Sequence, residues 1–169
     1  MIIVSDTSPV NNLIRVDHLF ILQQLFRKLV IPKAVYEELC EIPAQQKIIS
    51  EQNWITIAPV IYSELMSGLE HQLDKGEAES IALAIQLQAD YLLIDEMKGR
   101  HIAEEMGLKI VGLLGILVKA KQENVIVLVK PILERLIEEA GFRIHISLYN
   151  RILEVAGENL EWASLKTAI

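Results

Sequence analysis

Short apolar strands separated by helical segments are the feature that most restricts the fold of this chain. We expect strands at 2–4, 29–31, 54–57, 91–94 and 109–111, with helices between them and over about 113–123, 129–140 and 146–156. Such alternation predicts an α/β fold with a parallel sheet. The run Leu92-Leu93-Ile94 lacks polar alternation, so we expect helices on both faces of that sheet.

Composition narrows the class of protein further. The 169 residues are 51% hydrophobic and have a mean hydropathy of +0.31, which excludes a disordered chain and fits a single domain over 1–169. The longest apolar run, Ile110–Val118, is too short to cross a bilayer, which needs about 20 residues. Cys40 is the only cysteine, so no internal disulfide can form, and we expect a passive thiol and a cytoplasmic protein.

The charge balance limits how the chain could bind nucleic acid. Sixteen basic and 23 acidic residues give a net charge of −7, so bulk charge cannot hold a polyanion. Activity on nucleic acid would require a local basic patch or a bound metal ion. Lys98, Arg100 and His101 form one such small patch and could hold phosphates, although three residues of this kind also suit a solvated helical turn.

Two aspartates follow expected strands directly. Asp6 comes after the first strand and Asp95 after the strand 91–94. The carboxyl ends of parallel strands meet at one sheet edge, where ligands bind in open α/β folds. Each residue has a simpler interpretation, since Asp6 could organise a turn and Asp95 could cap the next helix. Together they favour a site for a hard divalent cation such as Mg²⁺ or Mn²⁺.

Glu77 and Glu38 are further candidates for this cation site. Their spacing along the chain does not decide between a structural and a functional role. Asp74 and Glu77 have the spacing of a capping box, which favours a purely structural role for Glu77. Glu38 lies on the apolar side of the helix after Pro32, whereas Glu37 lies on the solvated side. An inward acid requires a partner, but its methylene groups could also pack while the carboxylate reaches water.

Several other kinds of site are excluded by their missing motifs. The four histidines form no zinc-hydrolase pattern, and no Walker A loop or Gly-x-Ser-x-Gly motif occurs. A haloacid-type phosphatase would need a second Asp where Ser8 stands. A phosphoacceptor receiver domain would need an acidic pair after the first strand, and Asp6 is followed by Thr7.

Four segments together resemble the motifs of PIN-domain proteins. The segments run in the family's order, and they are Ser5-Asp6-Thr7-Ser8-Pro9, Ile31–Leu39, Gly76–Ala84 and Ala89–Glu96. The resemblance covers about 1–118, followed by a helical extension over about 119–160. It implies a three-layer α/β/α sandwich with a mainly parallel central sheet. The segment Ala140–Ile144, followed by Leu148-Tyr149, resembles the tail of a prokaryotic PIN-like subgroup related to VapC toxins.

The resemblance also implies an activity and its residues. PIN domains of this kind are metal-dependent endoribonucleases, and their acidic site carries over to Asp6, Glu38, Glu77 and Asp95 as catalytic residues and ligands of Mg²⁺ or Mn²⁺. Thr7 and Glu96 are implied auxiliary residues. Lys98 and Arg100 are then expected to contact substrate phosphates. The implied partners are an RNA substrate, a cognate antitoxin and a second copy of the chain. We expect no binding to a membrane.

One departure from the family pattern keeps a second hypothesis open. Many VapC-like members have Asp in the third motif, where this chain has Glu77. The longer side chain would shift or weaken a bound metal ion. The alternative is therefore a PIN-like binding or scaffold protein without useful turnover.

Overall fold

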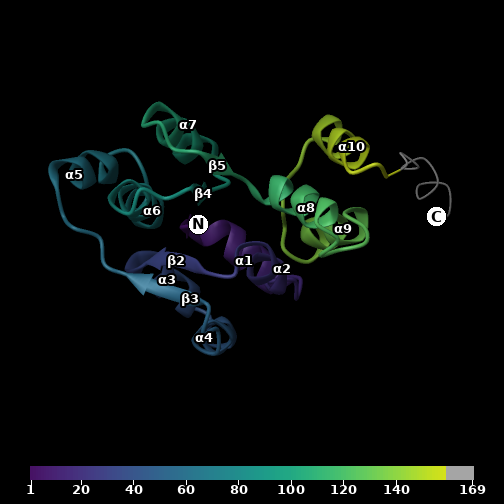
Figure 1. Ribbon diagram of the computed structural model, residues 1–169, viewed down its shortest axis with the longest axis horizontal. Coiled ribbons are helices and arrows are strands. Elements are labelled where there is room, and N and C mark those ends of the chain that lie inside the picture. The colour runs from purple at the N-terminus through teal and green to yellow at the C-terminus, as the bar shows by residue number, and fades with distance from the viewer. Residues whose placement is uncertain (159–169) are drawn as a thin grey trace.

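A five-stranded parallel sheet lies at the centre of the molecule (Figure 1). The structure is a computed structural model that describes residues 1–158. The strands are β1 (Ile3–Ser5), β2 (Leu29–Pro32), β3 (Ile55–Ala58), β4 (Tyr91–Leu93) and β5 (Ile110–Val111), in the order β3-β2-β1-β4-β5. Val4 lies opposite Val30 on one side and Leu92 on the other. All four neighbouring pairs are parallel, so the five carboxyl ends share one edge.

Helices connect the strands and cover the sheet. Before β4 the chain forms α1 (Thr7–Arg15), α2 (Phe20–Phe26), α3 (Lys33–Cys40), α4 (Pro43–Ser50), α5 (Glu64–Glu70) and α6 (Lys75–Gln86). After β4 it forms α7 (Met97–Glu105), α8 (Leu113–Gln122), α9 (Lys130–Glu138) and α10 (Ile146–Val155). Within residues 1–158, no helix is long and apolar enough to cross a membrane.

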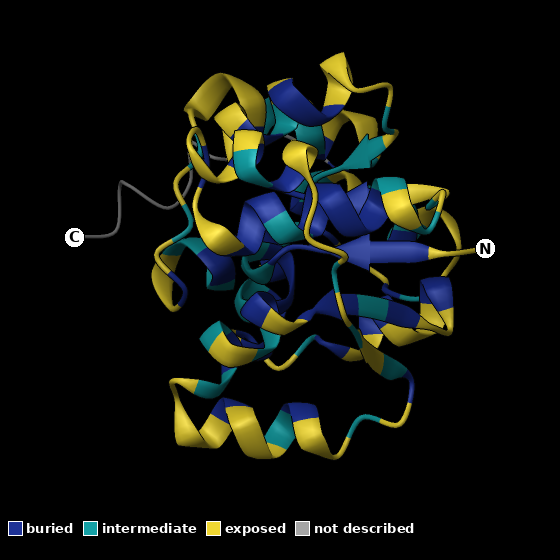
Figure 2. Ribbon diagram, turned by 90° about the vertical axis from the view of Figure 1, so that its left-hand side faces the viewer, coloured by how far each residue is buried: buried dark blue, intermediate teal, exposed yellow. Residues whose placement is uncertain are grey.

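Two hydrophobic clusters lie on opposite faces of the sheet. Ile3 and Leu93 belong to one cluster with α1, α2 and α8 to α10, whereas Val4 and Leu92 belong to the other with α5 to α7. The dark blue strands and inner helix surfaces of Figure 2 show this burial on both sides. The predicted three-layer α/β/α sandwich is therefore confirmed.

The C-terminal helices complete the same core as α1 and α2. Leu133 of α9 and Tyr149 of α10 are buried in that cluster. Glu158 ties the end of the described chain to α9, because its carboxylate accepts hydrogen bonds from the backbone N–H groups of Val129 (2.6 Å) and Lys130 (2.8 Å). The last residues of the expected extension over 119–160, and of the expected domain over 1–169, lie outside the described residues.

Two helix starts are notable. Helix α1 begins at Thr7, so Asp6 takes the N-cap position. The N-cap of α5 is Ser63, whose side chain accepts a hydrogen bond from the backbone N–H of Met66, and this short helix buries Met66 and Leu69.

Candidate functional site

Four acidic residues approach the carboxyl edge of the sheet from four different elements. Asp6 follows β1 directly, and Asp95 comes two residues after β4. Glu38 lies on α3, the helix that leaves β2. Glu77 lies in the first turn of α6, which leads into β4 and so begins at the carboxyl edge. Parallel pairing of β1 with both β2 and β4 places all four at this edge.

Asp6 is the most deeply buried of these acids, with only 3% of its surface exposed. The pKa of Asp6 is raised from 3.8 to about 7. Burial is the largest cause, a hydrogen bond from the Thr7 backbone opposes it, and the neighbouring charges of Glu77, Asp74 and Glu38 add to it. Although Asp6 occupies the N-cap position of α1, its side chain makes no capping hydrogen bond there. Helix capping therefore does not account for this carboxylate.

Glu38 is held between α1 and α6. The Thr7 hydroxyl donates a short hydrogen bond to Glu38 Oε2. Burial raises the pKa of Glu38, while the hydrogen bond from Thr7 lowers it. As expected, Glu37 is exposed and pairs with Lys33, whereas Glu38 is half-buried. The inward acid thus has a partner inside the protein.

Glu77 is buried and does not complete the expected capping box. Asp74 Oδ1 accepts a hydrogen bond from the backbone N–H of Glu77 at 2.8 Å, which caps α6. No reciprocal bond from Asp74 forms, and Glu77 Oε1 is buried with no hydrogen-bond partner in the described part of the chain. Burial also raises the pKa of Glu77, with the charge of Asp74 adding to the effect. Helix capping therefore explains Asp74 and leaves the Glu77 carboxylate free for chemistry.

Asp95 links β4 to the start of α8. Its Oδ1 accepts a hydrogen bond from the backbone N–H of Leu113 at 2.8 Å, so it caps α8 rather than the next helix, α7. Its Oδ2 is buried and has no hydrogen-bond partner within residues 1–158. Burial raises the pKa of Asp95, while the Leu113 hydrogen bond and the charge of Arg100 lower it. Asp95 Oδ1 therefore has a structural role, and Oδ2 is available to bind a ligand.

The other predicted site residues lie around these acids in different roles. Thr7 contacts Glu38 as described above. Glu96 is exposed at the N-cap of α7, and its charge raises the pKa of Glu77. Lys98 donates to the backbone oxygen of Gln72, and Arg100 donates to the backbone oxygen of Ile94 at 3.0 Å.

Three glycines in the site were not predicted as functional residues. A β-carbon at Gly76 would lie 2.7 Å from Glu38 Oε1, one at Gly99 would lie 3.0 Å from Glu77 Oε1, and one at Gly112 would lie 2.9 Å from Asp95 Oδ1. Each contact joins two elements, so spacing along the chain could not reveal it. Asp74 was also overlooked as a fifth acid, although its charge raises the pKa of Asp6, Glu38 and Glu77.

The donor chemistry fits a hard divalent cation. Two buried carboxylate oxygens, Glu77 Oε1 and Asp95 Oδ2, have no hydrogen-bond partner among the described residues, and oxygen ligands are those that Mg²⁺ and Mn²⁺ prefer. Among residues 1–158, no three His, Cys, Asp or Glu side chains lie close enough together to hold one ion. The fit therefore rests on the free oxygens and on the raised pKa values, and not on an assembled ligand set.

Comparison with known proteins gives the family. A family model for the PIN domain matches residues 2–158. No curated protein matches the chain at a significant level. PIN domains have a nuclease fold, commonly act as metal-dependent ribonucleases and generally use divalent metal ions. The match spans both the acidic edge and the C-terminal helices, and the chain belongs to the PIN domain family.

Proposed function

We propose that this protein is a divalent-metal-dependent endoribonuclease that hydrolyses RNA phosphodiester bonds. The observation that carries the proposal is the position of Asp6, Glu38, Glu77 and Asp95 at one sheet edge, where two buried oxygens have no partner among residues 1–158. Buried carboxylates without partners are costly, and they persist in proteins mainly where they bind a ligand or take part in chemistry.

The residues of the site have separable tasks in this proposal. Glu77 and Asp95 would hold the cation through their free oxygens, with Asp6 and Glu38 completing the acidic surface. Mg²⁺ or Mn²⁺ bound there would acidify a water molecule and offset charge on the reacting phosphate. Without metal the pKa of Asp6 is about 7, and the positive charge of a bound cation would favour its ionised carboxylate. Arg100 and Lys98 would contact phosphates flanking the cleaved bond, with Glu96 as an auxiliary ligand.

Cleavage of a mixed-sequence single-stranded RNA tests this function. Wild-type protein with Mn²⁺ should produce discrete fragments, and both EDTA and Asp6→Asn should abolish them. Circular dichroism must show that the variant is folded. No cleavage by folded wild-type protein over a range of divalent metals would contradict the proposal.

The second candidate is a PIN-like binding protein without turnover. It is favoured by the absence, within residues 1–158, of three acidic side chains gathered around one point. In that case Asp6→Asn would leave partner binding intact and no metal would induce cleavage. The same cleavage assay therefore separates the two candidates.

We further propose that the protein is the toxin of a toxin–antitoxin pair, acts in the cytoplasm and forms a homodimer. The net charge of −7 and the acidic edge suit an antitoxin that inserts a basic side chain among the carboxylates. Light scattering of the purified chain tests the dimer. Co-expression with a small open reading frame adjacent in the genome should relieve growth arrest if the toxin role is correct.

A further inference from the structure

A cavity of about 490 Å³ adjoins the acidic edge on the side of the C-terminal helices. Its lining includes Asp95 and Arg100 from the candidate site, Phe142 and Arg143 from the segment between α9 and α10, and Leu148 and Ile152 from α10. The cavity therefore begins at a predicted catalytic carboxylate and ends among apolar side chains. Ligand cavities in proteins commonly have volumes of about 300–1,000 Å³.

Arg143 is the cation that this cavity offers to a ligand. Its side chain is exposed, and it makes no ion pair or hydrogen bond with any residue from 1 to 158. Arg100, by contrast, already donates to the backbone oxygen of Ile94. In a chain with a net charge of −7, an unpaired guanidinium beside an acidic edge points to an anionic ligand.

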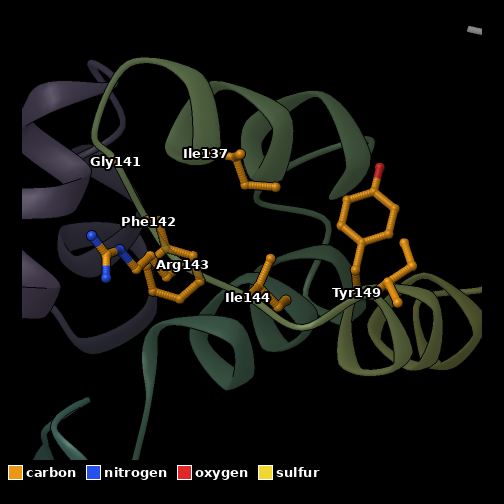
Figure 3. A pocket seen from close by; sticks show the side chains of 7 residues that line it. Ile137, Gly141, Phe142, Arg143, Ile144 and Tyr149 are labelled. Carbon is orange, nitrogen blue, oxygen red and sulfur yellow. The ribbon is translucent and has the colours of Figure 1, made fainter. Parts of the chain in front are cut away.

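The segment that carries Arg143 separates two hollows. It has no helix or strand, it begins at Gly141 with a φ of +70°, and the backbone N–H of Phe142 donates to Leu136 at 2.9 Å. On one side, Ile144 faces Ile137 and Tyr149 across a second, apolar cavity of about 470 Å³ (Figure 3). In the same view the guanidinium of Arg143 points away from those three side chains. Phe142, Arg143 and Ile144 line both cavities, so this segment forms the wall between them.

We propose that the cavity next to Asp95 is a subsite for one unpaired nucleotide of an RNA substrate, adjacent to the phosphodiester that is cleaved. The base would lie among Phe142, Leu148 and Ile152, and Arg143 would bind the neighbouring phosphate. Proteins commonly hold an unstacked base against aromatic and apolar side chains while cations bind the backbone. This inference rests on the proposed ribonuclease function, to which it adds a nucleotide subsite built by the segment between α9 and α10 and by α10.

The phosphate contact can be tested by binding alone. A fluorescein-labelled single-stranded RNA of mixed sequence is titrated with full-length protein in EDTA, which prevents metal-dependent cleavage, at several salt concentrations. Arg143→Gln should weaken binding about tenfold at low salt and reduce the slope of log K against log salt by about 0.7, the value for one phosphate contact on a single strand.

Arg27→Gln is the matched control for this experiment. Arg27 is exposed and precedes the amino end of β2, so it lies at the opposite edge of the sheet. The control should bind like the wild type. Equal affinity and salt slope in the two variants would overturn the proposal and leave the cavity as a surface for a protein partner.

The base contact can be tested with 2-aminopurine placed at successive positions of the same RNA. We expect its fluorescence to change on binding at one position, and Leu148→Glu should abolish that change. Val155→Glu is the control, because Val155 is exposed on the same helix but does not line the cavity. A signal that survives Leu148→Glu, or that is lost equally in both variants, would overturn the base subsite.

Failure of the subsite and failure of the nuclease give different results. Metal-dependent cleavage with no effect of Arg143→Gln on binding would retain the nuclease and reject the subsite. Arg143-dependent binding with no cleavage in any metal would retain the subsite and reject the nuclease.

Discussion

The carboxylate of Glu38 lies against the backbone of Gly76, where a β-carbon would come within 2.7 Å of Oε1. The same relationship joins Glu77 to Gly99 and Asp95 to Gly112. Each of these glycines lies at the N-cap or within the first three residues of a helix, where the helix dipole favours negative charge. Three acids are thus placed by glycines from neighbouring elements.

Gly76→Ala is expected to displace Glu38 while the fold is retained. The added methyl group would contact the end of a flexible side chain, so the carboxylate should move before the backbone does. We predict an RNA cleavage rate lowered about tenfold or more, with a melting temperature close to that of the wild type. Initial rates and thermal melts of the same samples measure the two effects.

Gly68→Ala in α5 provides the matched control, since a β-carbon at Gly68 would have nothing within 4 Å. Replacing glycine in a helix by alanine should stabilise it by up to about 1 kcal/mol, with unchanged cleavage. If both variants cleave RNA at the wild-type rate, the Gly76 contact does not position Glu38.

Thr7→Val should lower the cleavage rate because it removes the hydrogen bond that orients the Glu38 carboxylate. Valine keeps the shape of threonine but removes the hydroxyl that donates to Glu38 Oε2. A hydrogen bond to a charged group is worth about 1.5–3 kcal/mol, so the cleavage rate should fall about tenfold or more. Because that bond lowers the pKa of Glu38, the acidic limb of the pH–rate profile should also move to higher pH.

Thr7→Ser retains the hydroxyl and should restore both the cleavage rate and the pH profile. A serine variant as impaired as the valine variant would show that the methyl group of Thr7, and not its hydrogen bond, is what the site requires.

Asp6 should make the metal-free protein less stable as the pH rises. Its folded pKa of about 7 exceeds the ordinary value of 3.8, so between these values the folded state binds more protons than the unfolded state. The stabilisation is complete below pH 3.8 and is lost as the pH rises through about 7. The cost at high pH is as much as about 4 kcal/mol.

Asp6→Asn should remove this dependence, which urea unfolding in EDTA from pH 4 to pH 8.5 can measure. The variant should be more stable than the wild type at high pH, and the two should converge at low pH. Glu104→Gln, which removes an exposed carboxylate on α7, should follow the wild type over the whole range. Parallel curves for wild type and Asp6→Asn would contradict the burial argument.

Divalent metal should stabilise the wild type more at pH 8 than at pH 5.5. Protons and metal ions compete for carboxylates whose pKa values are raised, as those of Asp6, Glu77 and Asp95 are. The melting temperature with increasing Mn²⁺ therefore reports binding by mass action. Asp95→Asn should abolish the shift. A shift that is the same at both pH values would place the metal elsewhere on the molecule.

The order of the elements could be predicted from the sequence because it is local. Buried strand runs such as Leu92-Leu93-Ile94 and the Asp74 cap of α6 depend on neighbours in the chain. The roles of Glu77 and Asp95 depend on burial and on residues far along the chain. Leu113, for example, lies 18 residues after the Asp95 oxygen that caps it. Spacing alone therefore favoured a capping role for Glu77 that its side chain does not perform.

The contacts of the basic patch, Lys98, Arg100 and His101, also could not be predicted from the sequence. Lys98 and Arg100 are adjacent to Asp95 in sequence, but both already donate to backbone oxygens, and His101 pairs with Glu105. Arg143, which has no such partner among residues 1–158, lies more than forty residues away in the chain and approaches Asp95 only through the packing of the C-terminal helices.

The segment between α9 and α10 lies outside every helix and strand, and it contributes Phe142 and Arg143 to the cavity beside Asp95. All four candidate acids come from the first 95 residues. In the proposed enzyme, the acids of the hydrolytic step and the segment that lines the nucleotide subsite would thus lie in separate parts of the chain. Directed evolution confined to this short segment should alter the preferred RNA sequence and leave the hydrolytic step as it is.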